Sequence, residues 1–135
     1  MKRTVLIVDD SGDCAETLEL ALDGLTGFST SVVHSAEEAL AVFKKESVAA
    51  MVTDLHLPKM EGIELVHVVR SLPGGRDMPI LVVSGDSDPG TPALVLRAGA
   101  NAFFAKPYSP AAVRKRIKDL LLVAENGRNE HGPSA

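Results

Sequence analysis

Several polar side chains of this 135-residue sequence stand directly after short apolar segments, and their types suit phosphoryl chemistry. They are Asp9, Asp10, Asp54, Ser84 and Lys106. Three carboxylates close together repel one another unless a cation lies among them, and an all-oxygen cluster favours Mg²⁺ over zinc. One carboxylate could then act as a nucleophile toward phosphorus, while an ammonium and a hydroxyl take the remaining phosphoryl oxygens. The set therefore predicts phosphoryl transfer to Asp54, which would give an acyl phosphate.

Each of these residues also has an ordinary structural interpretation. Asp54 could form a turn or cap a helix, the Asp9-Asp10 pair could be a solvated acidic turn, Ser84 could be a cap and Lys106 a surface lysine. Taken singly, these interpretations are the commoner ones. Their joint occurrence after four different apolar segments favours a shared site.

The elements that must position these residues alternate between two periodicities. Continuous apolar or β-branched runs predict strands over residues 4–8, 28–34, 48–53, 80–83 and 101–105. The second run mixes serine and threonine with valine, which favours an edge strand. Apolar residues at helical spacing predict helices over residues 15–25, 36–43, 63–69, 92–97 and 110–124. This alternation predicts a mostly parallel α/β sheet with helices on both faces, and ligands bind beyond the carboxyl ends of such strands.

Three of the helix starts carry recognisable signals. Ser35 can accept a hydrogen bond from the amide of Glu38, and Ser109-Pro110 can open the last helix. In the fourth helix Thr91 is expected to be the N-cap, with Pro92 at the first helical position and Gly99 at the end. The prolines at 89 and 92 predict a mobile or reshaped loop before this helix.

Length and composition limit the other classes of protein. The chain suits one domain over residues 1–125, followed by a flexible polar tail over residues 126–135. No apolar run reaches the roughly 20 residues of a membrane span, and a cytoplasmic location is expected. The single cysteine, Cys14, excludes an intramolecular disulfide and a cysteine-based metal cluster. A net charge of −4 argues against direct nucleic acid binding.

The chain resembles the response-regulator receiver domains (CheY-like) of two-component signalling over nearly its whole length. The matching features are the acidic pair after the first strand, Asp54 with its Leu-Pro-x-Met-x-Gly continuation, Ser84, and the Lys106-Pro107 dipeptide. The resemblance implies a flavodoxin-like fold, with a five-stranded parallel sheet in the order 2-1-3-4-5 and five helices on both faces.

By this resemblance Asp54 is the phosphoacceptor and part of a Mg²⁺ site. Asp10 would bind Mg²⁺ directly, Asp9 would assist through water, and the backbone carbonyl of His56 would complete the protein ligands. Lys106 would bond the phosphoryl group. These roles are expectations that the resemblance supplies.

The resemblance also implies a two-state switch. The hydroxyl of Ser84 would move toward the phosphoryl group, and Phe103 would turn inward behind it. Because Ser84 lacks the methyl group of threonine and Phe103 lacks the hydroxyl of tyrosine, we expect this coupling to be weaker or differently read out. The Lys106–Pro107 peptide bond is expected to be cis.

Two further side chains lie beside the expected site. His56 and Asp86 each follow a key residue by two positions, and we predict that they tune the lifetime of the acyl phosphate, in a direction that the sequence does not fix.

The resemblance implies a signalling module that catalyses its own phosphorylation and dephosphorylation and is otherwise not an enzyme. A sensor histidine kinase or a phosphotransfer protein would donate the phosphoryl group, and a separate effector protein would receive the signal. A homodimer through the fourth helix, fifth strand and fifth helix stays open. The alternative is a receiver-like interaction module that works without phosphorylation.

Two enzyme classes fit the residues less well. A nucleotide-binding enzyme needs a glycine-rich first loop, and this chain has acidic residues there. A phosphatase with an aspartyl nucleophile would typically carry it in an Asp-x-Asp motif after the first strand, which Asp9-Asp10-Ser11 does not match.

Overall fold

Five parallel strands form one sheet in the order β2-β1-β3-β4-β5, as predicted. The structure is a computed structural model that describes residues 3–10 and 12–134, without the side chains of residues 12–14 and 125–134. The strands are β1 (Arg3–Val8), β2 (Phe28–Val33), β3 (Val48–Asp54), β4 (Ile80–Ser84) and β5 (Ala102–Ala105). The helices are α1 (Gly12–Leu22), α2 (Ala36–Lys45), α3 (Gly62–Ser71), α4 (Thr91–Ala98) and α5 (Pro110–Ser134). The flavodoxin-like arrangement is therefore confirmed.

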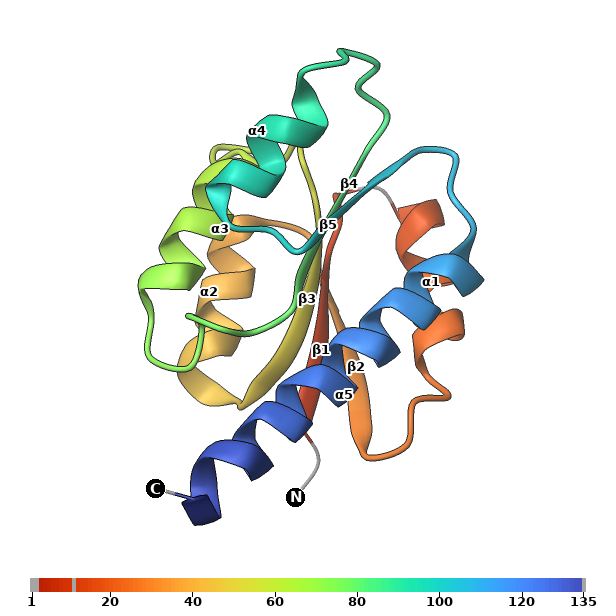
Figure 1. Ribbon diagram of the computed structural model, residues 1–135. Coiled ribbons are helices and arrows are strands. Elements are labelled where there is room, and N and C mark those ends of the chain that lie inside the picture. The colour runs from red at the N-terminus through yellow and green to blue at the C-terminus, as the bar shows by residue number, and fades with distance from the viewer. Residues whose placement is uncertain (1–2, 11, 135) are drawn as a thin grey trace.

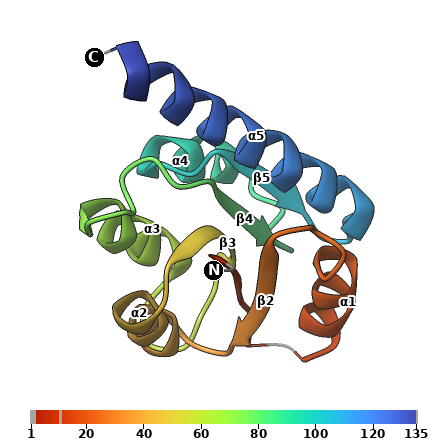
Figure 2. The same ribbon diagram turned by 90° about the horizontal axis from the view of Figure 1, so that it is seen from below.

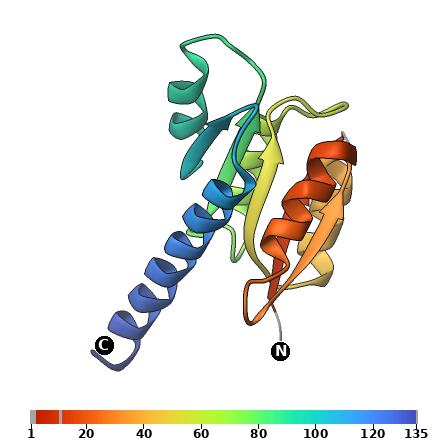
Figure 3. The same cartoon turned by 90° about the vertical axis from the view of Figure 1, so that its right-hand side faces the viewer.

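The helices cover both faces of the sheet. Helices α2, α3 and α4 lie on one face, and α1 and α5 lie on the other (Figures 1 and 3). Each face has its own apolar core, because alternate residues of a strand point to opposite sides. In β1, Leu6 packs toward α2 and α3, whereas Val5 and Ile7 pack toward α1 and α5. The sheet is thus packed between two apolar cores, which hold the ends of its strands in place.

The two edge strands are more exposed than the central ones, as the mixed composition of residues 28–34 predicts for β2. All residues of β3 and β4 are buried, whereas most residues of β2 and β5 are partly exposed. Figure 2 shows the twisted sheet from below, with β2 and β5 at its two edges. In β5, Phe103 and Phe104 pack into the cores on opposite faces, and both stay partly exposed.

The start of α2 confirms the predicted cap and adds a second contact. The amide of Glu38 donates to Ser35 Oγ at 3.1 Å. The Glu38 carboxylate accepts from the amide of His34 at 2.8 Å, one residue earlier than a capping box would have it. In α5, Ser109 Oγ accepts from the amide of Ala112 at 3.2 Å, as Ser109-Pro110 predicts.

The start of α4 corrects the sequence prediction. Gly90 is the N-cap, and Thr91 is the first helical residue. Thr91 cannot cap the helix because its side chain is buried and hydrogen-bonds Asp86 instead. The preceding loop is built from two side-chain turns, with the amide of Asp88 donating to Asp86 Oδ1 and the amide of Gly90 donating to Asp88 Oδ1, each at 2.8 Å. The loop is therefore reshaped by aspartates, and its mobility stays a prediction.

Helix α5 continues to Ser134, past the predicted end of the domain at residue 125. No proline interrupts residues 126–132, and a glycine inside a helix costs only about 1 kcal/mol relative to alanine. The flexibility of residues 126–135 stays a prediction. Among the helices of the described residues, none is long and apolar enough to cross a membrane.

Candidate functional site

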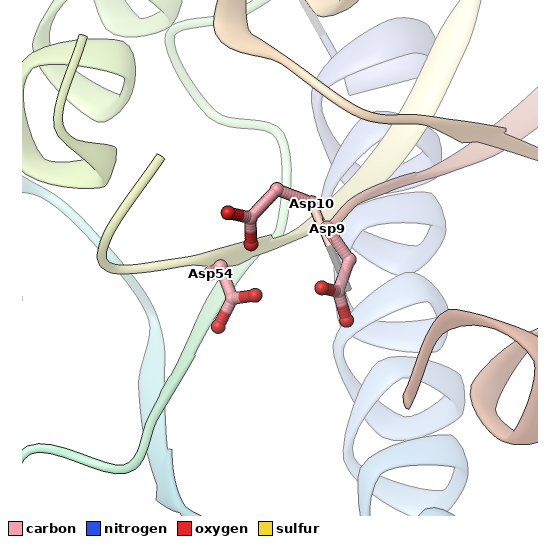
Figure 4. A group of neighbouring side chains, drawn as sticks. All are labelled: Asp9, Asp10 and Asp54. Atoms are coloured by element: carbon pink, nitrogen blue, oxygen red, sulfur yellow. The ribbon is translucent and has the colours of Figure 1, made fainter. Parts of the chain in front are cut away.

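Three carboxylates gather where β1 and β3 end. Asp9 and Asp10 follow β1, and Asp54 is the last residue of β3 (Figure 4). One oxygen atom from each of the three carboxylates lies within 4.8 Å of the other two. Asp9 and Asp54 are buried at 3% and 6% exposure, whereas Asp10 is exposed. The cluster is open to solvent on one side and fixed by the sheet on the other.

Lys106 brings a positive charge into this cluster from the end of β5. Its Nζ atom lies 2.8 Å from Asp54 Oδ1. The backbone holds it there, because the amide of Lys106 donates to the carbonyl of Ser84 at 2.7 Å. The Lys106–Pro107 peptide bond is cis, as expected from the resemblance. The ammonium thus reaches across β4 to the end of β3.

Burial is the largest cause that raises the pKa of Asp54, from its ordinary value of 3.8 to about 6. The hydrogen bond that the protonated Asp54 carboxyl donates to the Asp9 side chain and the negative charge of Asp9 also contribute to this rise of the pKa, and Lys106 opposes them. The positive charge of Lys106 alone therefore does not cancel the rise in the pKa of Asp54 that burial and Asp9 cause. The ligand atoms that the three side chains offer to a metal are all carboxylate oxygens, so the cluster fits a hard divalent cation such as Mg²⁺.

Ser84 stands at the end of β4, beside the cluster. Its side chain is 1% exposed, and its Oγ accepts a hydrogen bond from the amide of Asp86 at 2.9 Å. Phe103 lies opposite Val82 on β5 and packs against the core under α4. The switch role predicted for Ser84 and Phe103 stays a prediction.

The loop after Asp54 passes close over its backbone, and a glycine permits this. The amide of Gly62 donates to the carbonyl of Leu55 at 2.6 Å, and the amide of Leu55 donates to Val83 at 3.0 Å. A Cβ at position 62 would collide with the carbonyl of Asp54 and would meet Leu55 O at 3.0 Å. The Gly62 position is therefore part of what fixes the Asp54 carboxylate in place.

His56 joins the two loops that border the site. Its Nδ1 lies 2.8 Å from Glu61 Oε2, and its Nε2 lies 3.6 Å from Asp86 Oδ2. The hydrogen bond with Glu61 is the main cause that raises the pKa of His56. The amide of Asp88 is the main cause that lowers the pKa of Asp86. The sequence marks His56 and Asp86 as neighbours of the site but gives no sign that they meet.

The structure brings Asp9, Asp10, Asp54 and Lys106 into one cluster, and it places Ser84 at the adjoining strand end. Sequence reasoning missed Glu61 and His34. His34 Nδ1 lies 3.0 Å from the carbonyl of Asp9, across 25 residues of sequence. No local pattern marks a contact between residues so far apart along the chain.

Known proteins share this architecture. The sequence matches the response regulator receiver domain over residues 5–118. A chemotaxis protein CheY homolog of Campylobacter jejuni is 30% identical over 118 residues, which cover 87% of this chain and 91% of that protein.

Solved structures agree with the sequence match. A CheY-like response regulator receiver domain protein from Methanospirillum hungatei is similar with a TM-score of 0.83 and 28% identity, over 94% of this chain and 99% of that chain. The chemotaxis response regulator CheY4 of Vibrio cholerae has a TM-score of 0.78 and 26% identity, over 89% of this chain and 99% of that chain. The chain belongs to the response regulator receiver domains of two-component signalling.

Proposed function

We propose that this receiver domain accepts a phosphoryl group from a phosphohistidine donor onto Asp54 and thereby changes its output face for a partner protein. One observation carries the proposal: the Asp54 carboxylate is buried at a strand end, 2.8 Å from the Lys106 ammonium and beside two further carboxylates. The donor would be a sensor histidine kinase or a phosphotransfer protein, and the recipient of the signal a separate effector.

The reaction is the attack of an Asp54 carboxylate oxygen on phosphorus. A P–O bond forms, the P–N bond of the donor breaks, and the departing imidazole takes a proton from water. Rigid attachment to β3 holds the nucleophile in place, and Lys106 exchanges part of its contact with Asp54 for a phosphoryl oxygen. In hydrolysis, water attacks the same phosphorus, the P–O bond to Asp54 breaks, and inorganic phosphate leaves with the carboxylate restored.

The acidic cluster would hold Mg²⁺ through Asp10 and Asp54 directly and through Asp9 by way of water, with the backbone carbonyl of His56 as a further ligand. When bound, Mg²⁺ supplies positive charge that offsets the phosphoryl oxygens. Without it, the carboxylates would repel the incoming group.

The output change would begin at Ser84. Its Oγ accepts from the amide of Asp86, so its O–H proton stays available, and the side chain would move toward a phosphoryl oxygen to donate it. That movement would alter the space under α4 into which Phe103 packs. Leu94 and Leu96 on α4 are exposed large apolar residues, which supports a contact surface on α4, β5 and α5 for the effector or for a second copy.

The test is a phosphorylation assay read by intact mass. The protein is incubated with Mg²⁺ and acetyl phosphate, and the wild type is expected to gain the mass of one phosphate. Asp54→Asn should gain nothing, and Lys106→Met should gain it far more slowly. Lys115→Met is the matched control, because Lys115 is exposed on α5 and paired with Asp119 at 3.0 Å. An equal gain in Asp54→Asn would contradict the proposal, and no gain with any donor would favour an interaction module that works without phosphorylation.

A further inference from the structure

We infer that His34 is a positioning residue for the acidic pair: its imidazole holds the peptide group between Asp9 and Asp10 and so sets the affinity of the site for Mg²⁺. The inference rests on the proposed function, because it assigns the acidic cluster to a divalent cation. His34 lies just after β2, and its contact with Asp9 joins β2 to the end of β1.

The direction of this hydrogen bond follows from its acceptor. His34 Nδ1 lies 3.0 Å from the backbone oxygen of Asp9, and a carbonyl oxygen can only accept. Nδ1 therefore carries the proton and donates it. The amide of Asp9 in turn donates to the carbonyl of Val33 at 3.0 Å. Both polar groups of the Asp9 backbone are thus held by the end of β2.

The position of this contact gives it influence over the site. The carbonyl of Asp9 belongs to the peptide group that links Asp9 to Asp10, so a rotation of this group would move both side chains. The pairing of β1 with β3 ends at Val8, opposite Thr53. After Val8, backbone pairing with β3 no longer fixes the chain. The hydrogen bond from the His34 imidazole restrains the backbone at Asp9, the first residue of the acidic pair.

His34 is itself fixed on the start of α2. Its amide donates to Glu38 Oε2 at 2.8 Å, and the amide of Glu38 donates to Ser35 Oγ at 3.1 Å. The orientation of the Asp9–Asp10 peptide group is therefore tied to the N-terminus of a helix that packs on the core. Partners that orient metal ligands in this way commonly change metal affinity when they are lost.

The test is calorimetric titration of the full, unphosphorylated chain with MgCl₂. His34→Ala removes the donor, and its dissociation constant for Mg²⁺ is expected to rise about tenfold. His34→Asn can place an amide N–H where Nδ1 lies and should restore most of the affinity. His67→Ala is the matched control, because His67 is an exposed histidine on α3, and it should bind as the wild type does.

The outcomes separate the inference from the proposed function. A wild type that does not bind Mg²⁺ would overturn both. A wild type that binds Mg²⁺, with unchanged affinity in His34→Ala, would overturn the role of His34 alone. Thermal unfolding without Mg²⁺ is measured in parallel, and a lower melting temperature with unchanged affinity would show a structural role only. If His34→Ala does not fold, His34→Gln, whose amide lies one bond farther out, takes its place and should bind as weakly.

Discussion

Replacing Asp54 by asparagine is expected to stabilise the metal-free protein. The pKa of the Asp54 carboxyl is raised from 3.8 to about 6, chiefly by burial and also by Asp9, so the folded state disfavours the charged form. A tenfold change in proton affinity is about 1.4 kcal/mol, and the two values therefore differ by about 3 kcal/mol. Asparagine removes this charge but also removes the ionic partner of Lys106, so we expect a net gain of about 1 to 3 kcal/mol in the free energy of unfolding.

The pH dependence of this gain follows from the sign of the shift. Because the folded-state pKa of Asp54 lies above its ordinary value, the protonated carboxyl favours the fold below pH 3.8, and this contribution is lost as the pH rises to about 6. Asparagine does not titrate. The advantage of Asp54→Asn should therefore be full at pH 7.5 and largely gone at pH 3.5.

Urea unfolding at these two pH values, in EDTA, measures the difference. A third series at pH 7.5 with saturating Mg²⁺ should reduce the difference in free energy of unfolding between Asp54→Asn and the wild type. The reason is that a ligand that binds only the folded wild type stabilises the wild type. Asp23→Asn is the control, since Asp23 is an exposed residue after α1. An Asp54→Asn variant no more stable than the wild type at pH 7.5 in EDTA would refute the reasoning.

Two further predictions concern the loops around Asp54. His56→Ala and Asp86→Ala should each change the rate at which the acyl phosphate is lost, because both side chains border the site and lie 3.6 Å apart. This rate is measured by following the intact mass over time. Unchanged rates in both variants would contradict the prediction. Gly62→Ala should lower the free energy of unfolding by about 2 kcal/mol or more and slow phosphorylation, because its Cβ would collide with the carbonyl of Asp54. If Gly62→Ala has the same free energy of unfolding and the same phosphorylation rate as the wild type, the close contact between position 62 and the Asp54 carbonyl is not important.

The sheet and the approximate site could be predicted because they depend on simple repeating features. The apolar run at residues 80–83 predicted a parallel strand, and the structure has β4 there, buried throughout. The more polar run at residues 28–34 predicted an edge strand, and β2 lies at an edge. Parallel strands bring their carboxyl ends to the same edge of the sheet. The predicted strands therefore place Asp54 and Lys106 at one edge, where the two side chains are in contact.

The remaining details depend on contacts that no local pattern contains. Threonine is a common N-cap residue, but the side chain of Thr91 is buried and bonded to Asp86, and Gly90 takes that position instead. His34 reaches the carbonyl of Asp9 only because β2 and β1 are neighbours in the sheet. Such contacts follow from register and side-chain packing, which the sequence does not display.

The most direct test of the central claim is to locate the phosphoryl group. The protein is treated with acetyl phosphate and Mg²⁺, the acyl phosphate is reduced with borohydride, and the digested peptides are sequenced by mass spectrometry. We predict that residue 54 alone is reduced to homoserine, and that no reduction occurs when Mg²⁺ is withheld. Reduction at Asp9 or Asp10, or a stable phosphate on another residue with Asp54 unmodified, would contradict the assignment of Asp54 as the phosphoacceptor.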